Sequence, residues 1–268
     1  MQQQDLQTSI FKEGSVTYFY SSRFFPPAIL RKISSLYAYV RVIDDIMDTT
    51  KYNKKQLEIF WQQTQNAWSG EAVTNSVVQD FIQLAKTHAF EWEWIEAFWS
   101  SMRQDQTKSH YDTYQELEEY MYGSAEVIGL MMARILKLPK KAEHAARLQG
   151  RAMQFVNFIR DVGEDVHLHR NYLGYSQEIA NDPELWATFI RQQIDHYWQM
   201  QQEAEKGYRF IPRQYLIPIK TAADMYGWTA RRIYDNPSIV WRRQLKPRPW
   251  SVMFTLLKNQ WELRHHAQ

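Results

Sequence analysis

Two short acidic segments have residue types and spacing that could support chemistry. In the first, Asp44 and Asp48 stand four residues apart, so one face of a helix would carry both carboxylates. Like charges at this spacing repel each other, and the residues around them are largely apolar. A bound cation would relieve both problems, and hard divalent cations such as Mg²⁺ take carboxylate oxygens. The alternative interpretation is a solvated acidic patch at the end of a helix.

The second segment favours the metal site. Asn157, Asp161 and Asp165 follow one another at intervals of four residues, so an amide and two carboxylates form an oxygen-only stripe over two helical turns. These ligands suit Mg²⁺ better than Zn²⁺, which favours His or Cys. Two such stripes on separate helices can face each other across a cavity, where a cation cluster would hold a diphosphate and support its departure. Ordinary ion pairs on a polar helix face are the alternative.

The rest of the chain predicts the helices that must position these stripes. Of 268 residues, 44% are hydrophobic, and only 9 are Gly and 9 Pro, which is too few for the turns of a many-stranded fold. Apolar residues recur at helical spacing, and no alternating strand pattern is visible. We expect one all-α domain over residues 1–268. Its predicted helices run from Pro26-Pro27 to Met47, from a cap at Asn53 to Ser69, over 74–88 and 91–104, from a capping box at Thr113–Glu116 to Leu138, and over 140–169, 182–207, 214–234 and 249–265.

Composition also excludes several classes of protein. The absence of Cys excludes disulfides, Cys-ligated zinc, iron–sulfur clusters and thiol nucleophiles. A formal charge of +2 gives no electrostatic argument for nucleic acid as a partner. No signal-peptide pattern is visible, and the longest apolar stretch, Val127–Leu136, is far too short to span a membrane. We therefore expect a cytoplasmic protein with no obligate protein partner, at most peripheral to the inner face of the membrane.

Both acidic segments lie in motifs that resemble the squalene and phytoene synthase family, the head-to-head isoprenyl diphosphate synthases. The first is similar to LYAFCRxxDDxxD and reads Leu36-Tyr-Ala-Tyr-Val40-Arg41-Val-Ile-Asp44-Asp45-Ile-Met-Asp48, with Val where Cys is usual. The second is similar to QLTNILRDVxED…RxYLP and reads Gln154 to Asp165, then Arg170-Asn-Tyr172-Leu173-Gly174, with Gly where Pro is common. Ser15-Val-Thr17-Tyr18 followed by Phe25-Pro26, and Tyr120 to Gly129, resemble two further family motifs. The stretch from Glu203 to Tyr226 resembles a later helix pair more weakly, so the resemblance covers roughly residues 14–250.

This resemblance implies the all-α class I terpenoid synthase bundle around a central cavity. It also implies that two isoprenyl diphosphates join through a cyclopropylcarbinyl diphosphate, with the departed diphosphate as the expected proton acceptor. The implied metal is Mg²⁺ or Mn²⁺, and its implied ligands are Asp44, Asp48, Asn157, Asp161 and Asp165. The residues implied to contact diphosphate or shape the cavity are Ser15, Thr17, Tyr37, Arg41, Gln154, Asn157, Arg160 and Tyr172. The residues implied to be catalytic are Asp44, Asp48, Asp161, Asp165, Arg160 and Tyr172.

Three functions remain open at this stage. The stretch from Tyr122 to Met132 is more similar to bacterial phytoene synthases than to eukaryotic squalene synthases, which favours two C20 geranylgeranyl diphosphates and phytoene. Two C15 farnesyl diphosphates would give dehydrosqualene or squalene, and squalene would require NADPH. The absence of a GxGxxG fingerprint discriminates poorly, because the family binds NADPH without one. A non-catalytic assembly protein is the third alternative, although all five metal-ligand positions are intact.

Two further features leave alternatives open. The segment Val240–Trp250 is basic and aromatic, so it could bind a diphosphate, lie against anionic lipid or be a solvated surface segment. Arg160 lies roughly 100° around the helix from the predicted metal stripe. It could therefore reach a diphosphate or simply pair with Glu164, four residues further on.

Overall fold

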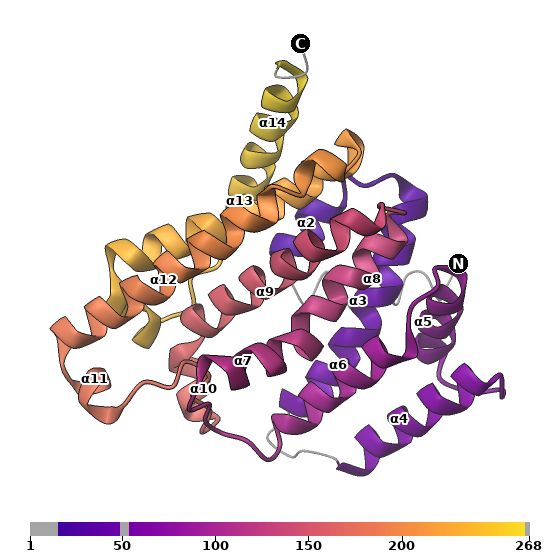
Figure 1. Ribbon diagram of the computed structural model, residues 1–268, viewed down its shortest axis with the longest axis horizontal. Coiled ribbons are helices and arrows are strands. Elements are labelled where there is room, and N and C mark those ends of the chain that lie inside the picture. Colours follow the sequence, from indigo (N-terminus) through magenta and orange to yellow (C-terminus); the bar gives the residue numbers. More distant parts are fainter. Residues whose placement is uncertain (1–15, 49–53, 266–268) are drawn as a thin grey trace.

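The computed structural model describes the backbone of residues 16–48 and 54–265, and within these ranges it leaves out the side chains of residues 16–18 and 48. The described residues form a bundle of helices (Figure 1). In chain order the elements are α2 (Val16–Ser22), α3 (Pro27–Asp48), α4 (Lys54–Ser69), α5 (Ser76–Thr87), α6 (Trp92–Gln104), α7 (Tyr114–Met121), the π-helix η1 (Tyr122–Glu126), α8 (Val127–Ile135), the 3-10 helix η2 (Lys140–Ala142), α9 (Glu143–Arg160), α10 (Val162–His167), α11 (Gln177–Asn181), α12 (Pro183–Glu205), the 3-10 helix η3 (Tyr208–Phe210), α13 (Arg213–Asp235), the 3-10 helix η4 (Pro237–Trp241) and α14 (Pro249–His265).

The predicted all-α fold is confirmed, and two predicted long helices need correction. No strand occurs in residues 16–48 and 54–265, where only an isolated bridge joins His110 and Asn171. The helix predicted over 113–138 is interrupted by the π-helix η1. The helix predicted over 140–169 is divided into η2, α9 and α10, with a junction at Asp161. The predicted cap at Asn53 lies outside the described residues.

The π-helix lies where the chain crosses α6 very closely. A Cβ added to Gly123 would come within 2.1 Å of the Ala97 carbonyl oxygen, so only glycine fits there. At the same crossing, the Ser101 hydroxyl donates a hydrogen bond to the Tyr120 carbonyl oxygen over 2.9 Å. An α-helix would use that carbonyl to accept from the amide of residue 124. The interruption therefore follows from a tertiary contact and not from the local sequence.

Helix α3 is fixed by aromatic packing on the side away from its acidic residues. Tyr39 is stacked on Phe81 with ring centroids 3.7 Å apart. Its hydroxyl accepts a hydrogen bond from Trp99 Nε1 over 2.8 Å and shares another with the Thr64 hydroxyl over 3.0 Å. Every polar group in this buried contact therefore has a partner, which makes the position of α3 specific.

Helix α9 lies in the middle of the bundle, between α8 and α12 (Figure 1). Its approach to α8 and η1 is unusually close, because a Cβ on Gly129 would lie 2.1 Å from the Ala146 carbonyl oxygen. Ion pairs also stabilise the contact between η1 and α9. Glu126 of η1 is fully buried and accepts hydrogen bonds from Arg147 and Arg151 of α9. No helix among the described residues is both long and apolar enough to cross a membrane.

Candidate active site

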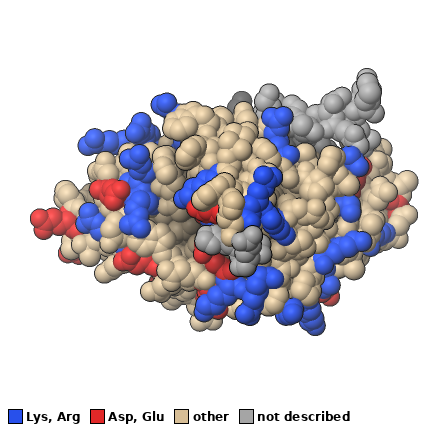
Figure 2. All heavy atoms as spheres, turned by 90° about the horizontal axis from the view of Figure 1, so that it is seen from above, with Lys and Arg blue, Asp and Glu red and all other residues tan. Residues whose placement is uncertain are grey.

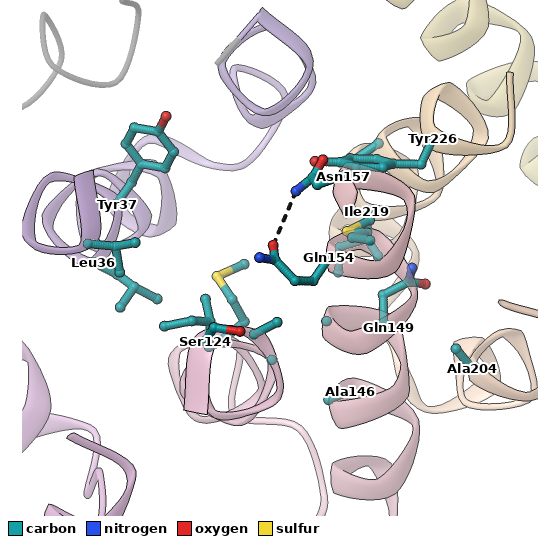
Figure 3. A pocket seen from close by; sticks show the side chains of 18 of the residues that line it. Leu36, Tyr37, Ser124, Ala146, Gln149, Gln154, Asn157, Ala204, Ile219 and Tyr226 are labelled. Carbon is teal, nitrogen blue, oxygen red and sulfur yellow. Dashed lines mark hydrogen bonds between the residues drawn. The ribbon is translucent and has the colours of Figure 1, made fainter. Parts of the chain in front are cut away.

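The described residues of the two predicted stripes border one cavity of about 750 Å³. Asp44 enters it from α3, and Asn157, Asp161 and Asp165 enter it from α9, the junction and α10. Figure 3 shows part of the cavity wall, with Tyr37 on α3 across the cavity from Gln154 and Asn157 on α9. The junction between α9 and α10 keeps the helical spacing of these residues. The amide of Asp161 donates to the Asn157 carbonyl oxygen, and the amide of Asp165 donates to the Asp161 carbonyl oxygen, each over 2.8 Å.

The cavity collects most of the residues that the sequence analysis singled out. Those that line it are Tyr37, Arg41, Asp44, Gln154, Asn157, Arg160, Asp161, Asp165 and Tyr172. Asp48 is the last residue of α3 and Thr17 lies in α2, but the side chains of both are outside the description, as is the whole of Ser15. The predicted site is therefore assembled from segments more than a hundred residues apart.

Asn157 is held in place by one end of its amide while the other end has no protein partner. Its Nδ2 donates to Gln154 Oε1 over 3.2 Å, as the dashed line in Figure 3 marks. Its Oδ1 is buried and has no hydrogen-bond partner. Since buried oxygens are rarely left unbonded, this atom fits a cation ligand. Among the described residues, no three His, Asp or Glu side chains lie close enough together to form a metal site by themselves, and the side chain of Asp48 is not among those described.

The carboxyl of Asp165 is destabilised in its charged form. Burial is the largest cause, the nearby Asp161 adds repulsion, and Arg170 offsets only part of this, so the pKa of Asp165 rises to about 8. A divalent cation at this position would reverse the effect and return the carboxyl to its charged form. The donor set of one amide and several carboxylate oxygens therefore fits Mg²⁺ or Mn²⁺ both in chemistry and in charge.

Arg160 makes a two-pronged contact with Asp161. Its Nε and Nη2 donate to Asp161 Oδ1 and Oδ2 over 2.7 and 2.6 Å. Burial alone would lower the pKa of Arg160, but the hydrogen bonds and charge of Asp161 outweigh it and raise the pKa. Arg160 therefore pairs with Asp161 and not with Glu164. The carboxylate of Glu164 accepts a hydrogen bond from Gln244. Arg160 thus lies beside the predicted metal-binding stripe, at the cavity wall.

Asp105 is a polar residue of the cavity that the sequence analysis missed. The hydroxyl of Tyr120 donates to its Oδ2 and that of Tyr172 to its Oδ1, each over 2.8 Å. Burial is the main cause that raises the pKa of both tyrosines, and the charge of Asp105 adds to it. One weak signal was available, because Asp105 caps the C-terminal end of α6, where the helix dipole disfavours a carboxylate.

Tyr172 reaches this cluster because its loop is tied back to the α6–α7 connection. The amide of Asn171 donates to the Ser109 carbonyl over 2.7 Å, and the Tyr172 ring stacks on Phe158 at 4.4 Å. Gly174 then turns the chain with φ +66°, and a Cβ there would lie 2.6 Å from the Tyr111 carbonyl oxygen. Proline cannot adopt this φ, which explains the departure from the family pattern at this position.

Sequence and fold comparisons agree with this geometry. Residues 11–251 match the family described as squalene/phytoene synthase. The chain belongs to the squalene/phytoene synthase family. The 15-cis-phytoene synthase of Synechocystis sp. is 25% identical over 89% of this chain and 79% of its own length. The 15-cis-phytoene synthase of Pantoea ananas is 29% identical over 60% of this chain and 56% of its own.

Solved structures of the family share the fold. A dehydrosqualene synthase in complex with ligand superposes with a TM-score of 0.86 at 18% identity, covering 98% of this chain and 97% of that chain. The squalene synthase HpnC from Alicyclobacillus acidocaldarius gives a TM-score of 0.75 at 18% identity, covering 91% and 95%. The all-α isoprenoid synthase bundle expected from the resemblance is therefore confirmed.

The basic segment Val240–Trp250 contributes two residues to the lining of the cavity. Gln244 and Lys246 line it beside Glu164, and Gln244 Nε2 donates to the Glu164 carboxylate. Trp241 anchors the start of the segment by packing on Trp186, with ring centroids 4.7 Å apart. The middle part of Val240–Trp250 therefore lies at the edge of the cavity, and the binding of a diphosphate or of lipid by this segment stays a prediction. No residue of this segment was among the predicted site residues.

The cavity changes character away from the acidic stripes. Away from the stripes, its lining includes the small residues Ala146 of α9, Ala204 of α12 and Gly207, together with Gln149 and Tyr208, which hydrogen-bond to each other. Figure 3 shows Ala146 and Ala204 on the side of the cavity away from Asn157. The small side chains leave room for a long hydrocarbon chain, and the polar end would hold its charged head.

Proposed function

We propose that this protein joins two geranylgeranyl diphosphates head to head, through a cyclopropylcarbinyl diphosphate, to give phytoene in carotenoid biosynthesis. The observation that carries the proposal is that Asp44 of α3 and the stripe of Asn157, Asp161 and Asp165 on α9–α10 border one cavity, which apolar side chains also line. Family membership supports an enzyme of prenyl transfer. The curated relatives named phytoene synthase support the C20 substrate.

In this mechanism the protein binds both diphosphates at the polar end and keeps water from the carbocations. Mg²⁺ or Mn²⁺, held by Asp44 and Asp48 on one side and Asn157, Asp161 and Asp165 on the other, would neutralise the leaving diphosphates and promote ionisation. Arg160, Arg41 and Lys246 lie where they can bind diphosphate oxygens. Ser15, Thr17, Tyr37, Gln154 and Tyr172 are proposed to complete the binding of substrate.

Two ionisations and two proton losses balance the proposed reaction. Departure of the first diphosphate lets C1 of that chain attack the double bond of the second substrate, and loss of one proton closes the cyclopropane. Departure of the second diphosphate opens the ring, and loss of another proton gives the linear product. A released diphosphate is the proposed proton acceptor. No hydride is consumed, so NADPH is needed only if squalene is the product.

A product assay tests the substrate and the ending of the reaction. The protein is supplied with Mg²⁺ and either C15 or C20 diphosphate, with and without NADPH, and the hydrocarbons are identified by mass spectrometry. We expect phytoene from the C20 substrate without NADPH. A C30 product formed in preference would replace the proposal with dehydrosqualene synthesis, and product formed only with NADPH would move the protein to squalene synthesis. No hydrocarbon under any condition would favour the non-catalytic alternative.

Single substitutions test the metal ligands. Asp44→Ala, Asp161→Ala and Asp165→Ala should each abolish turnover and leave the helical circular dichroism intact, because each removes a hard ligand and no core volume. Asp195→Ala, an exposed aspartate of α12, is the matched control and should keep full activity. Activity above about a tenth of wild type in all three variants would refute the assignment. Chelation should stop the reaction and Mg²⁺ restore it, whereas restoration by Zn²⁺ alone would contradict the choice of oxygen ligands.

A further inference from the structure

Helix α14 carries large apolar side chains on the face that points away from the protein. Among the described large hydrophobic residues, the four most exposed are Trp250 (68%), Phe254 (68%), Trp261 (62%) and Leu257 (56%). Their spacing of four, three and four residues places them on one stripe about 16 Å long, which we call the α14 stripe. A helix on a protein surface normally presents polar residues there, so the stripe needs an explanation of its own.

The packing of α14 does not explain the stripe. The opposite face of the helix is the one that holds it in place, with Val252, Leu256 and Asn259 buried. The Asn259 Nδ2 donates to Asp224 Oδ2 over 2.7 Å, which ties α14 to α13. In Figure 1 the helix runs away from the bundle toward the C-terminus, so its outer side faces no other described element.

The charges around the α14 stripe have one predominant sign. Residues 248–265 contain a single acidic residue, Glu262, and its side chain pairs with Lys258 over 3.6 Å. The Lys and Arg residues of the same stretch are Arg248, Lys258 and Arg264. Helical geometry places Lys258 and Arg264 on opposite sides of the stripe. Figure 2 looks onto the end of the molecule from which α14 projects and shows Lys and Arg outnumbering Asp and Glu there.

We propose that the α14 stripe docks the protein on a membrane surface that contains anionic lipid. Tryptophan at both ends of the stripe suits the boundary between headgroups and acyl chains, where its ring is buried and its N–H stays hydrated. The basic residues at its sides would meet lipid phosphates. A second copy of the chain is a poorer occupant, because pairing two identical stripes would bring the same positive charges together.

The position of α14 gives this docking a consequence for the cavity. Helix α14 packs on α2 and α13, and both of these helices line the cavity, through Ser21 and Ser22 of α2 and Pro218 and Ile219 of α13. A membrane bound at the α14 stripe would therefore lie on the side of the molecule where α2 and α13 form a wall of the cavity. This step, unlike the docking itself, rests on the proposed function, since a hydrocarbon product needs an apolar phase to leave into.

Vesicle binding of the full-length protein tests the docking. Sedimentation with vesicles of phosphatidylcholine alone, or mixed with phosphatidylglycerol, gives the partition coefficient. We expect binding to the anionic vesicles, reduced roughly tenfold or more by Phe254→Ser with Leu257→Ser, because less apolar area is then buried. Ile59→Ser with Leu185→Ser removes two exposed apolar side chains from α4 and α12 and should leave binding unchanged. Lys258→Gln with Arg264→Gln should weaken only the binding to anionic vesicles, again roughly tenfold.

The absence of Cys allows a second, site-specific measurement. An environment-sensitive dye on Phe254→Cys should shift to the blue when anionic vesicles are added, and the same dye on Ile59→Cys should not. Failure of the wild type to bind vesicles, or binding that survives Phe254→Ser with Leu257→Ser, would overturn the proposal. A dye signal that is already blue-shifted without lipid would also overturn it, with concentration dependence indicating a second copy and its absence indicating another part of this chain. Activity on detergent-dispersed substrate should be equal in wild type and stripe variants, so these outcomes are independent of the proposed function.

Discussion

Two carboxylates beside α9, Glu126 and Asp165, sit in environments of opposite kind. Glu126 is fully buried, and two arginines of α9 hydrogen-bond to it, Arg147 Nε over 2.7 Å and Arg151 Nε over 2.5 Å. Asp165 has Asp161 nearby, and burial with this repulsion raises its pKa to about 8. The fold neutralises the first carboxylate with its own cations and leaves most of the charge of the second uncompensated. The first is therefore a structural group, and the second is suited to receive a ligand cation.

The largest effect on stability should come from removing the charge that the fold neutralises. Glu126→Gln leaves Arg147 without its carboxylate and Arg151 with Glu118 alone, at a contact between η1 and α9 where Glu126 itself is buried. We expect this to cost about 2–3 kcal/mol of unfolding free energy. Denaturation monitored by circular dichroism gives this value. Glu118→Gln, which removes the partly exposed partner of Arg151, is the matched control and should cost about 1 kcal/mol or less. Equal losses in the two variants would show that burial of Glu126 is not the cause.

Arg160 tests the other side of the comparison, where charge is arranged for a ligand. The guanidinium of Arg160 can form two parallel hydrogen bonds to a diphosphate, and these strengthen as negative charge develops on the leaving group. Lysine cannot form both bonds, so Arg160→Lys should lower turnover by about 10²–10³. Thermal stability should change little, because the positive charge is kept. Glu164→Gln lies four residues further on and should leave turnover near wild type. Near wild-type turnover of Arg160→Lys would place the diphosphate elsewhere in the cavity.

The raised pKa of Asp165 should make the stability of the protein depend on pH. Its folded-state pKa of about 8 lies above the unfolded value near 3.9, so the folded protein binds a proton that the unfolded chain releases. In metal-free protein this favours folding below about pH 4, and the contribution is lost as the pH rises toward 8. Because Asp165 borders a cavity that water can enter, we expect a loss on the order of 1–3 kcal/mol. Asp165→Asn should remove this loss at pH 8 while abolishing turnover, and an unchanged pH profile would contradict the assigned environment.

The sequence predicted the parts of this site that follow from helical periodicity. Asp44 and the stripe from Asn157 to Asp165 could be placed on helix faces because residues four apart lie on one face in any helix. The π-helix could not be predicted, because it depends on Ser101 and Ala97 of another helix. Asp105 was missed for the same reason, since two tyrosines from distant segments give it its role. Likewise, the range of α14 could be predicted, but not which of its apolar faces would be left without a partner.

Asp44 and Asp45 repeat the comparison at adjacent positions and should give its smallest effect. Asp44 lines the cavity, whereas Asp45 is 53% exposed at its side chain and pairs with Arg41 over 2.5 Å. An exposed pair one helical turn apart contributes about 0–1 kcal/mol, so Asp45→Asn should scarcely change the unfolding free energy. Arg41 keeps its position on the cavity wall, and kcat should therefore change by less than about threefold. Asp44→Asn, the matched variant one residue away, should lose turnover almost completely. If Asp45→Asn instead lowers kcat as strongly as Asp44→Asn, Asp45 holds Arg41 in the geometry that binds diphosphate, and the division between surface and ligand-binding carboxylates would have to be redrawn on α3.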